Sequence, residues 1–154
     1  ARCFLLISFG QRLTQYPAVR FADVDMVSQA TPLADFKATG SSSERTRYLL
    51  LAESAFLQAL QLEPTYVRAL YSLGVLYTCD MDQPLKAIPY LEKLLTIDTK
   101  HTDAMMVLAR AHYQLYNYDA AVTYYDQVIS TSGDKQKVAN ATYNKKVVLD
   151  AAYN

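Results

Sequence analysis

The chain has little glycine, no excess of either charge and no long apolar run. Four glycines among 154 residues favour helices joined by short turns. The 15 basic and 15 acidic side chains cancel, which argues against nucleic-acid binding and against attraction to a membrane surface by charge. The apolar stretch 3–9 is far shorter than the ~20 residues of a membrane span. We expect it to form a core helix, with a strand as the alternative.

The side chains that usually carry chemistry are few and scattered. The two cysteines, Cys3 and Cys79, match no zinc or redox spacing, so two buried thiols are expected, with one disulfide as the alternative. His112 lies on a predicted helix without nearby metal ligands, and His101 lies in a predicted turn; we expect His112 to be structural. The acidic turn at 80–82 lacks the glycine and final glutamate of a calcium loop. We therefore expect no catalytic residue, no metal site and no cofactor.

Apolar residues recur at helical spacing along most of the chain. Hydrophobic residues make up 51% of the sequence, enough for the packed core of one ordinary domain. The run from Gly40 to Ser43 is the clearest linker, and a helix is expected from there to Leu62, where Glu63-Pro64 ends it. Further helices are expected at residues 66–79, 84–97, 102–115, 118–130 and 135–152.

An internal repeat organises these helices. When Val67–His101 is laid over Thr102–Lys135, small and large apolar residues coincide, with periods of 35 and 34 residues and one extra residue assigned to the first turn. Gly74 falls on Ala109, and Ala87 falls on Ala121. Small residues at these positions let two antiparallel helices approach closely, and pairs that cannot bury both faces alone stack into a solenoid.

The repeated stretches resemble the tetratricopeptide repeat over about residues 45–135. The matching segments are Leu70-x-x-Leu73-Gly74-x-x-Tyr77, Ala52-x-x-x-Phe56-x-x-Ala59-x-x-x-x-Pro64 and Tyr118-Asp119-x-Ala121-x-x-x-Tyr125. The chain departs from the family pattern at Leu70 and Met105, where an aromatic is common, and at Tyr116, where glycine is frequent. The resemblance implies an all-α fold of antiparallel helix pairs, stacked as a short right-handed superhelix with a C-terminal capping helix.

The resemblance divides the chain into two parts. Residues 1–40 show no clear repeat, and we expect helical segments there that cover the first repeat. Residues 41–154 form the repeat domain, with a half repeat at 43–64, repeats at 67–101 and 102–135, and the capping helix at 135–152.

The resemblance also implies a function. In the family, the first helix of each pair lines a concave groove that takes a peptide or helix of a partner protein. The family's lysine and asparagine clamp for a terminal carboxylate is disfavoured, because Tyr71 and Met106 stand where its lysine or asparagine would be needed. The matching groove positions are Arg68, Tyr71, Val75, Thr78, Asp103, Met106, Arg110, Tyr113, Lys137, Asn140 and Asn144.

Two roles without catalysis are therefore expected as alternatives. In the first, the chain is an adaptor that binds a partner peptide or helix in the groove. In the second, it is a structural or accessory subunit of a homo-oligomer or larger complex, which it contacts through residues 1–40 or the convex face.

Overall fold

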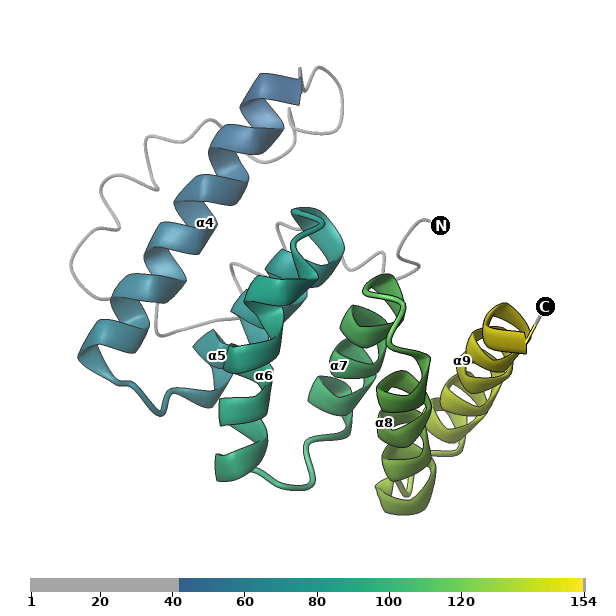
Figure 1. Ribbon diagram of the computed structural model, residues 1–154. Helices are drawn as coiled ribbons and strands as arrows, with labels where there is room; N and C mark the ends of the chain where they lie inside the picture. Colours follow the sequence, from purple (N-terminus) through teal and green to yellow (C-terminus); the bar gives the residue numbers. More distant parts are fainter. Residues whose placement is uncertain (1–41, 154) are drawn as a thin grey trace. The chain divides into compact units, whose positions relative to one another are not determined.

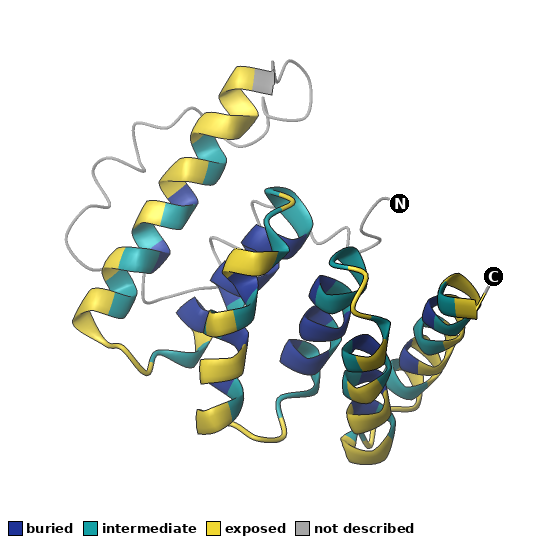
Figure 2. Cartoon of the chain, viewed as in Figure 1, coloured by how far each residue is buried: buried dark blue, intermediate teal, exposed yellow. Residues whose placement is uncertain are grey.

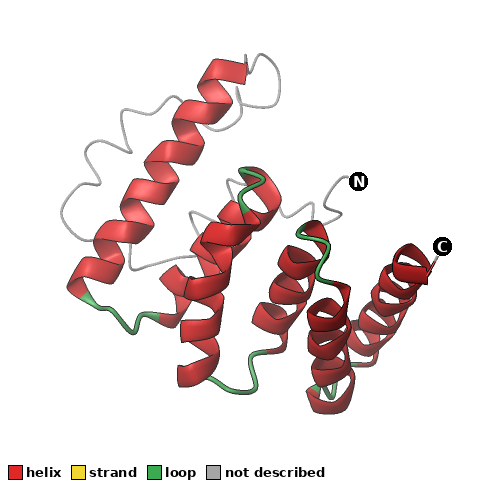
Figure 3. Ribbon diagram, in the orientation of Figure 1, coloured by secondary structure: helices red, strands yellow, loops and turns green. Residues whose placement is uncertain are grey.

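The computed structural model describes residues 42–153, and every regular element in this range is a helix (Figure 3). The expectations for residues 1–40, including the helix at 3–9 and the state of Cys3, lie outside the described residues. Within the described part the all-α repeat fold is confirmed. The elements are α4 (Ser42–Leu62), α5 (Val67–Val75), the π-helix η2 (Leu76–Asp80), α6 (Pro84–Ile97), α7 (Thr102–Gln114), α8 (Tyr118–Thr131) and α9 (Lys135–Tyr153).

Helix α4 belongs to a first unit that ends at Pro64 and is described here by itself. Its sequence is amphipathic, and the structure buries Ala52 and Phe56, two members of the predicted apolar stripe. Leu50 and Leu51, off that stripe, are about half exposed. The helical period read from the sequence therefore identifies the buried side of this helix.

The second unit, residues 65–154, contains α5 to α9 in chain order (Figure 1). Loops at 81–83 and 115–117 reverse the chain between the two helices of a pair, so the helices are antiparallel neighbours. Helix α7 contacts α5 and α6 of the preceding pair as well as its own partner α8, and α9 packs on α8. The first helices of successive pairs thus lie next to one another.

Small residues lie where paired helices cross, as the repeat predicts. Gly74 on α5 faces the side chain of Leu91 on α6, and a Cβ atom at Gly74 would overlap that leucine. Ala87, Ala109 and Ala121, the other small residues predicted at the crossings, are completely buried. Buried residues lie along the inner side of these helices, and exposed ones along the outer side (Figure 2).

A continuous apolar cluster joins the last three helices. Each contributes a few buried side chains, so α9 is held to the repeats by core packing as well as by polar contacts. The buried members are Met105, Ala109, Ala121, Tyr125, Val128, Ala141 and Val148.

The two loops between paired helices share one backbone feature. Asp82 and Tyr116, each two residues before the next helix, have positive φ values of 53° and 60°. This left-handed conformation is costly for residues other than glycine and closes the turn in both repeats. It explains why glycine is frequent in the family at the position that Tyr116 occupies here.

The extra residue of the first repeat lies in a helix and not in the turn to which the sequence comparison assigned it. The amide of Met81 donates to the carbonyl of Leu76, five residues back, at 2.9 Å, which defines a π-turn. In the second repeat the amide of Leu115 donates to Ala111, four residues back, at 3.2 Å. Both loops are three residues long (81–83 and 115–117), so the difference of one residue is taken up by η2.

Candidate interaction face

The predicted partner-binding residues fall on one stripe of each first helix, at helical spacing. Because the repeats are offset by 35 and 34 residues, these residues form rows of equivalent positions across α5 with its continuation η2, α7 and α9. We call this set the first-helix face. Its rows are Arg68, Asp103 and Lys137; Tyr71, Met106 and Asn140; Val75, Arg110 and Asn144; and Thr78 with Tyr113.

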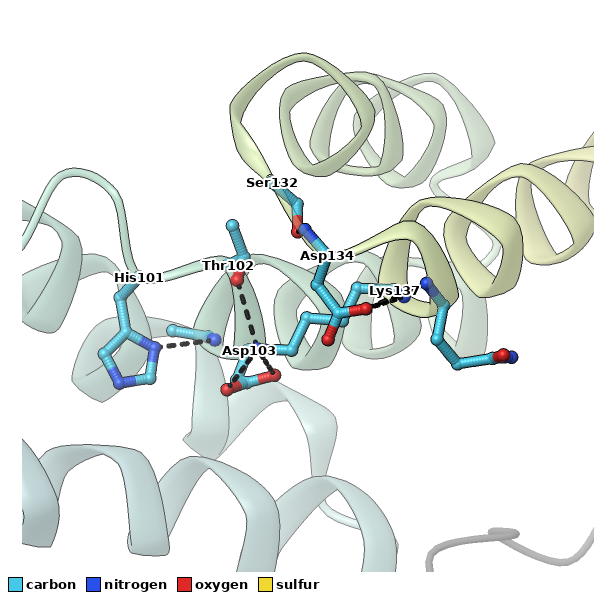
Figure 4. A network of polar contacts seen from close by, with 8 residues as sticks. His101, Thr102, Asp103, Ser132, Asp134 and Lys137 are labelled. Atoms are coloured by element: carbon cyan, nitrogen blue, oxygen red, sulfur yellow. Dashed lines mark hydrogen bonds and ion pairs between the residues drawn. The ribbon is translucent and has the colours of Figure 1, made fainter.

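The first row brings two predicted residues into direct contact (Figure 4). The Nζ atom of Lys137, on the first turn of α9, lies 2.9 Å from Oδ1 of Asp103, on the first turn of α7. It also lies 3.4 Å from the hydroxyl oxygen of Thr102. Lys137 is thus neutralised by Asp103 of the same chain. The start of α9, which carries Lys137, is fixed by the Asp134 carboxylate, which accepts from the amide of Gln136 at 2.8 Å.

The start of α7 is held by a histidine that the sequence placed in a turn. Nδ1 of His101 accepts from the amide of Ala104 at 3.1 Å, so His101 is the N-cap of α7. Its ring lies 5.2 Å from the ring of Tyr71, a predicted face residue on α5. Sequence reasoning missed this role because serine, threonine, asparagine and aspartate are the usual N-caps, whereas histidine gives no such signal.

The residues of the face differ in exposure. Arg68 and Asn140 are exposed, whereas Tyr71, Met106, Arg110, Tyr113 and Asn144 are half-buried. Val75 and Thr78 are only 6% and 1% exposed, so a partner would reach them only if neighbouring side chains moved. Partner contact by any of these residues stays a prediction.

Arg110 is the cation in the middle of the face, and its surroundings differ from those of Lys137. Its Nε atom is buried and has no hydrogen-bond partner. Burial raises the pKa of Tyr125 to about 12, and the positive charge of Arg110 acts against this rise. Arg110 and Tyr125 therefore interact electrostatically, and Arg110 as a whole is half-buried.

His112 lies between α7 and α8. Its ring stacks on Tyr124 at 5.5 Å with an interplanar angle of 13°. Burial lowers the pKa of His112, and Glu92 acts in the opposite direction. This packing supports the structural role expected for His112.

Neither histidine belongs to a cluster of metal-ligating side chains, since residues 42–153 contain no group of three or more such side chains that could hold a metal ion. In the acidic turn at 80–82, Oδ1 of Asp82 lies 3.5 Å from Nε2 of Gln114.

Cys79 is half-buried on η2. Cys3, its partner in the alternative of a disulfide, lies outside the described residues. Over the same described range, no helix combines the length and apolar character needed to cross a membrane.

Comparison with known proteins gives two matches. Residues 80–142, from the end of η2 into α9, match the tetratricopeptide-repeat family. The chain is also 28% identical over 106 residues to a TPR repeat-containing protein of Borreliella burgdorferi, an alignment that covers 67% of this chain and 46% of that protein. The chain thus spans a little under half the length of this relative. These matches confirm the resemblance read from the sequence.

Proposed function

Since residues 80–142 are tetratricopeptide-repeat sequence, a kind of repeat that generally mediates protein–protein interaction, we propose that this protein is an interaction module without catalysis of its own. Its first-helix face would bind a peptide or helix of a partner protein. The observation that carries the proposal is the continuity of this face. Contacts between Lys137 and Asp103, and between Tyr71 and His101, join successive first helices.

The character of the face suits a protein segment. Half-buried Met106 and Tyr113 offer apolar and aromatic area, and tyrosine provides contact area at a low cost in side-chain entropy. Arg68, Arg110 and Asn140 add polar groups around this area. A mixture of this kind is typical of protein interfaces, in which aromatic residues, methionine and arginine are enriched.

A selection from a random peptide library displayed on phage would test the proposal. The wild-type chain is expected to retain peptides whose binding is lost in Met106→Arg, because the long charged side chain would occupy the centre of the face. Gln127→Arg, on the exposed side of α8, is the matched control and should bind as wild type does. If selected peptides bind both variants equally, the face is not the binding surface.

The alternative role as a structural subunit has one observation in its favour. Helix α9 exposes two large aromatic side chains, Tyr143 at 70% and Tyr153 at 81%, with Val147 partly exposed nearby. Tyr143 and Val147, four residues apart, share one side of α9, and exposed apolar side chains next to one another often mark a contact with another chain. Light scattering over a concentration series would decide between the roles: a monomer at all concentrations favours the adaptor, and a stable assembly favours the subunit.

A further inference from the structure

The first-helix face carries three cations: Arg68, which is exposed, and Arg110 and Lys137, which are half-buried. The two half-buried cations differ in whether the chain neutralises them. Lys137 is paired with Asp103 at 2.9 Å and lies near the hydroxyl of Thr102. Arg110 takes part in none of the ion pairs found within residues 42–153. Its buried Nε lacks a hydrogen-bond acceptor. Lys137 is therefore satisfied internally, whereas Arg110 retains a buried donor without an acceptor.

The repeat register explains this difference. Lys137 shares its row with Asp103, so an acid stands at the equivalent position of the neighbouring helix. Arg110 shares its row with Val75 and Asn144, and neither can supply a carboxylate. Along α7 the face residues on either side of Arg110 are Met106 and Tyr113, which are also without acidic groups.

A buried guanidinium N–H without an acceptor is unfavourable, and such groups require an explanation in a native structure. Arg110 as a whole is half-buried, so a partner carboxylate can approach its guanidinium, and it would supply the missing acceptor once the side chain turns enough to uncover Nε. The planar fork of arginine matches a carboxylate, and a half-buried position strengthens the attraction over that in bulk water. Apolar Met106 and Tyr113 lie one helical turn away in each direction.

We propose that Arg110 recognises an aspartate or glutamate side chain within the bound segment, beside an apolar residue that packs on Met106 and Tyr113. This inference rests on the proposed function and names the chemistry of the partner. An internal acidic residue is favoured over a chain end because apolar positions continue along α7 on both sides of Arg110. Lys137 contributes less, since a partner's acid would have to displace Asp103, which is held in place on the same chain.

The test uses the full chain and the peptides selected from the random library. Peptides that depend on Met106 should be enriched in aspartate or glutamate. Replacing that acid in a selected peptide by its amide, or Arg110→Gln in the protein, should each weaken binding about tenfold, equivalent to ~1.4 kcal/mol. The two changes together should cost little more than either alone, because both remove the same contact.

Two further variants separate charge from geometry. Lys93→Gln, on the exposed side of α6, removes the same charge away from the face and should change binding by less than about twofold. Arg110→Lys keeps the charge and loses the fork, so an intermediate affinity is expected. It also serves as the test protein if circular dichroism shows that Arg110→Gln does not fold.

The outcomes distinguish this inference from the function on which it rests. Peptides that require Met106 but show no acidic preference, or that bind Arg110→Gln as tightly as wild type, would overturn the role of Arg110 and leave the interaction face intact. If no peptide depends on Met106, both proposals fail.

Discussion

At the residue scale, the phenol of Tyr125 couples stability to alkaline pH. Tyr125 is 5% exposed, and burial raises its pKa to about 12, above the value near 10 of an unfolded tyrosine. The folded state therefore keeps this proton when the unfolded state has lost it. The contribution to stability is fully present below pH 10 and is lost as the pH rises from 10 to 12.

Tyr125→Phe should remove this part of the pH dependence. Between pH 10 and pH 12, wild type is expected to lose up to ~1.4 kcal/mol of unfolding free energy per pH unit relative to the variant. Urea unfolding of both proteins at pH 8 and at several alkaline values measures the difference. Tyr143→Phe, on an exposed side of α9, controls for loss of a phenol as such. Parallel curves for wild type and Tyr125→Phe would contradict the assignment.

His112 should make the unfolding free energy depend on pH in the acid range. Burial lowers its pKa below the ordinary value of 6.5, so the unfolded chain takes up a proton near pH 6.5 before the folded chain does. The stabilisation from a neutral His112 is thus present above about pH 6.5 and falls as the pH decreases. His112→Phe, which keeps a ring against Tyr124, should flatten this dependence in urea unfolding between pH 7.5 and 5. A slope unchanged by the substitution would show that other groups cause it.

At the scale of elements, the crossing of α5 and α6 should be intolerant of a single methyl group. A Cβ atom at Gly74 would overlap the side chain of Leu91, which is completely buried. We expect Gly74→Ala to lower the unfolding free energy by about 1–3 kcal/mol, the usual cost of overpacking. Gly133→Ala is the control, because nothing lies within 4 Å of its added Cβ. Thermal or urea unfolding measures the unfolding free energy of both variants. Equal changes in Gly74→Ala and Gly133→Ala would contradict tight packing at the crossing.

A substitution in the loop before α8 should increase the stability of the protein. Tyr116 has a φ of 60°, which asparagine adopts at a lower cost than tyrosine. Tyr116→Asn should therefore raise the unfolding free energy by up to about 1 kcal/mol. Tyr116→Ala has no such freedom and should give no gain from the backbone. A gain of the same size in both variants would point to the exposed ring and not to the backbone.

The sequence was sufficient for the helices and their buried stripes, because helical period and small residues at crossings are local signals with one structural reading. The location of the extra residue of the first repeat could not be predicted from the sequence, because a π-turn and a longer loop are compatible with the same apolar pattern. The pairing of Lys137 with Asp103 could have been inferred from their equivalent repeat positions. The cap at His101 could not, because it depends on ring orientation.

At the scale of the whole molecule, a stack in which each pair contacts its neighbours should not open as one unit. Helix α7 is in contact with α5, α6 and α8, and six of its residues are buried, whereas α9 buries Ala141 and Val148. Native-state hydrogen exchange should give α7 amides higher opening free energies than α9 amides. Equal protection of both helices would mean that the unit opens cooperatively.

The π-turn at Leu76–Asp80 bears on how such repeats change length. A residue accommodated inside a helix leaves the following loop, its left-handed residue and the start of the next helix as they are in the other repeat. The usual assumption that insertions belong in loops would misplace this one. An alignment of this chain with related sequences should therefore open its gap within residues 76–80, where the hydrogen bonds record the insertion.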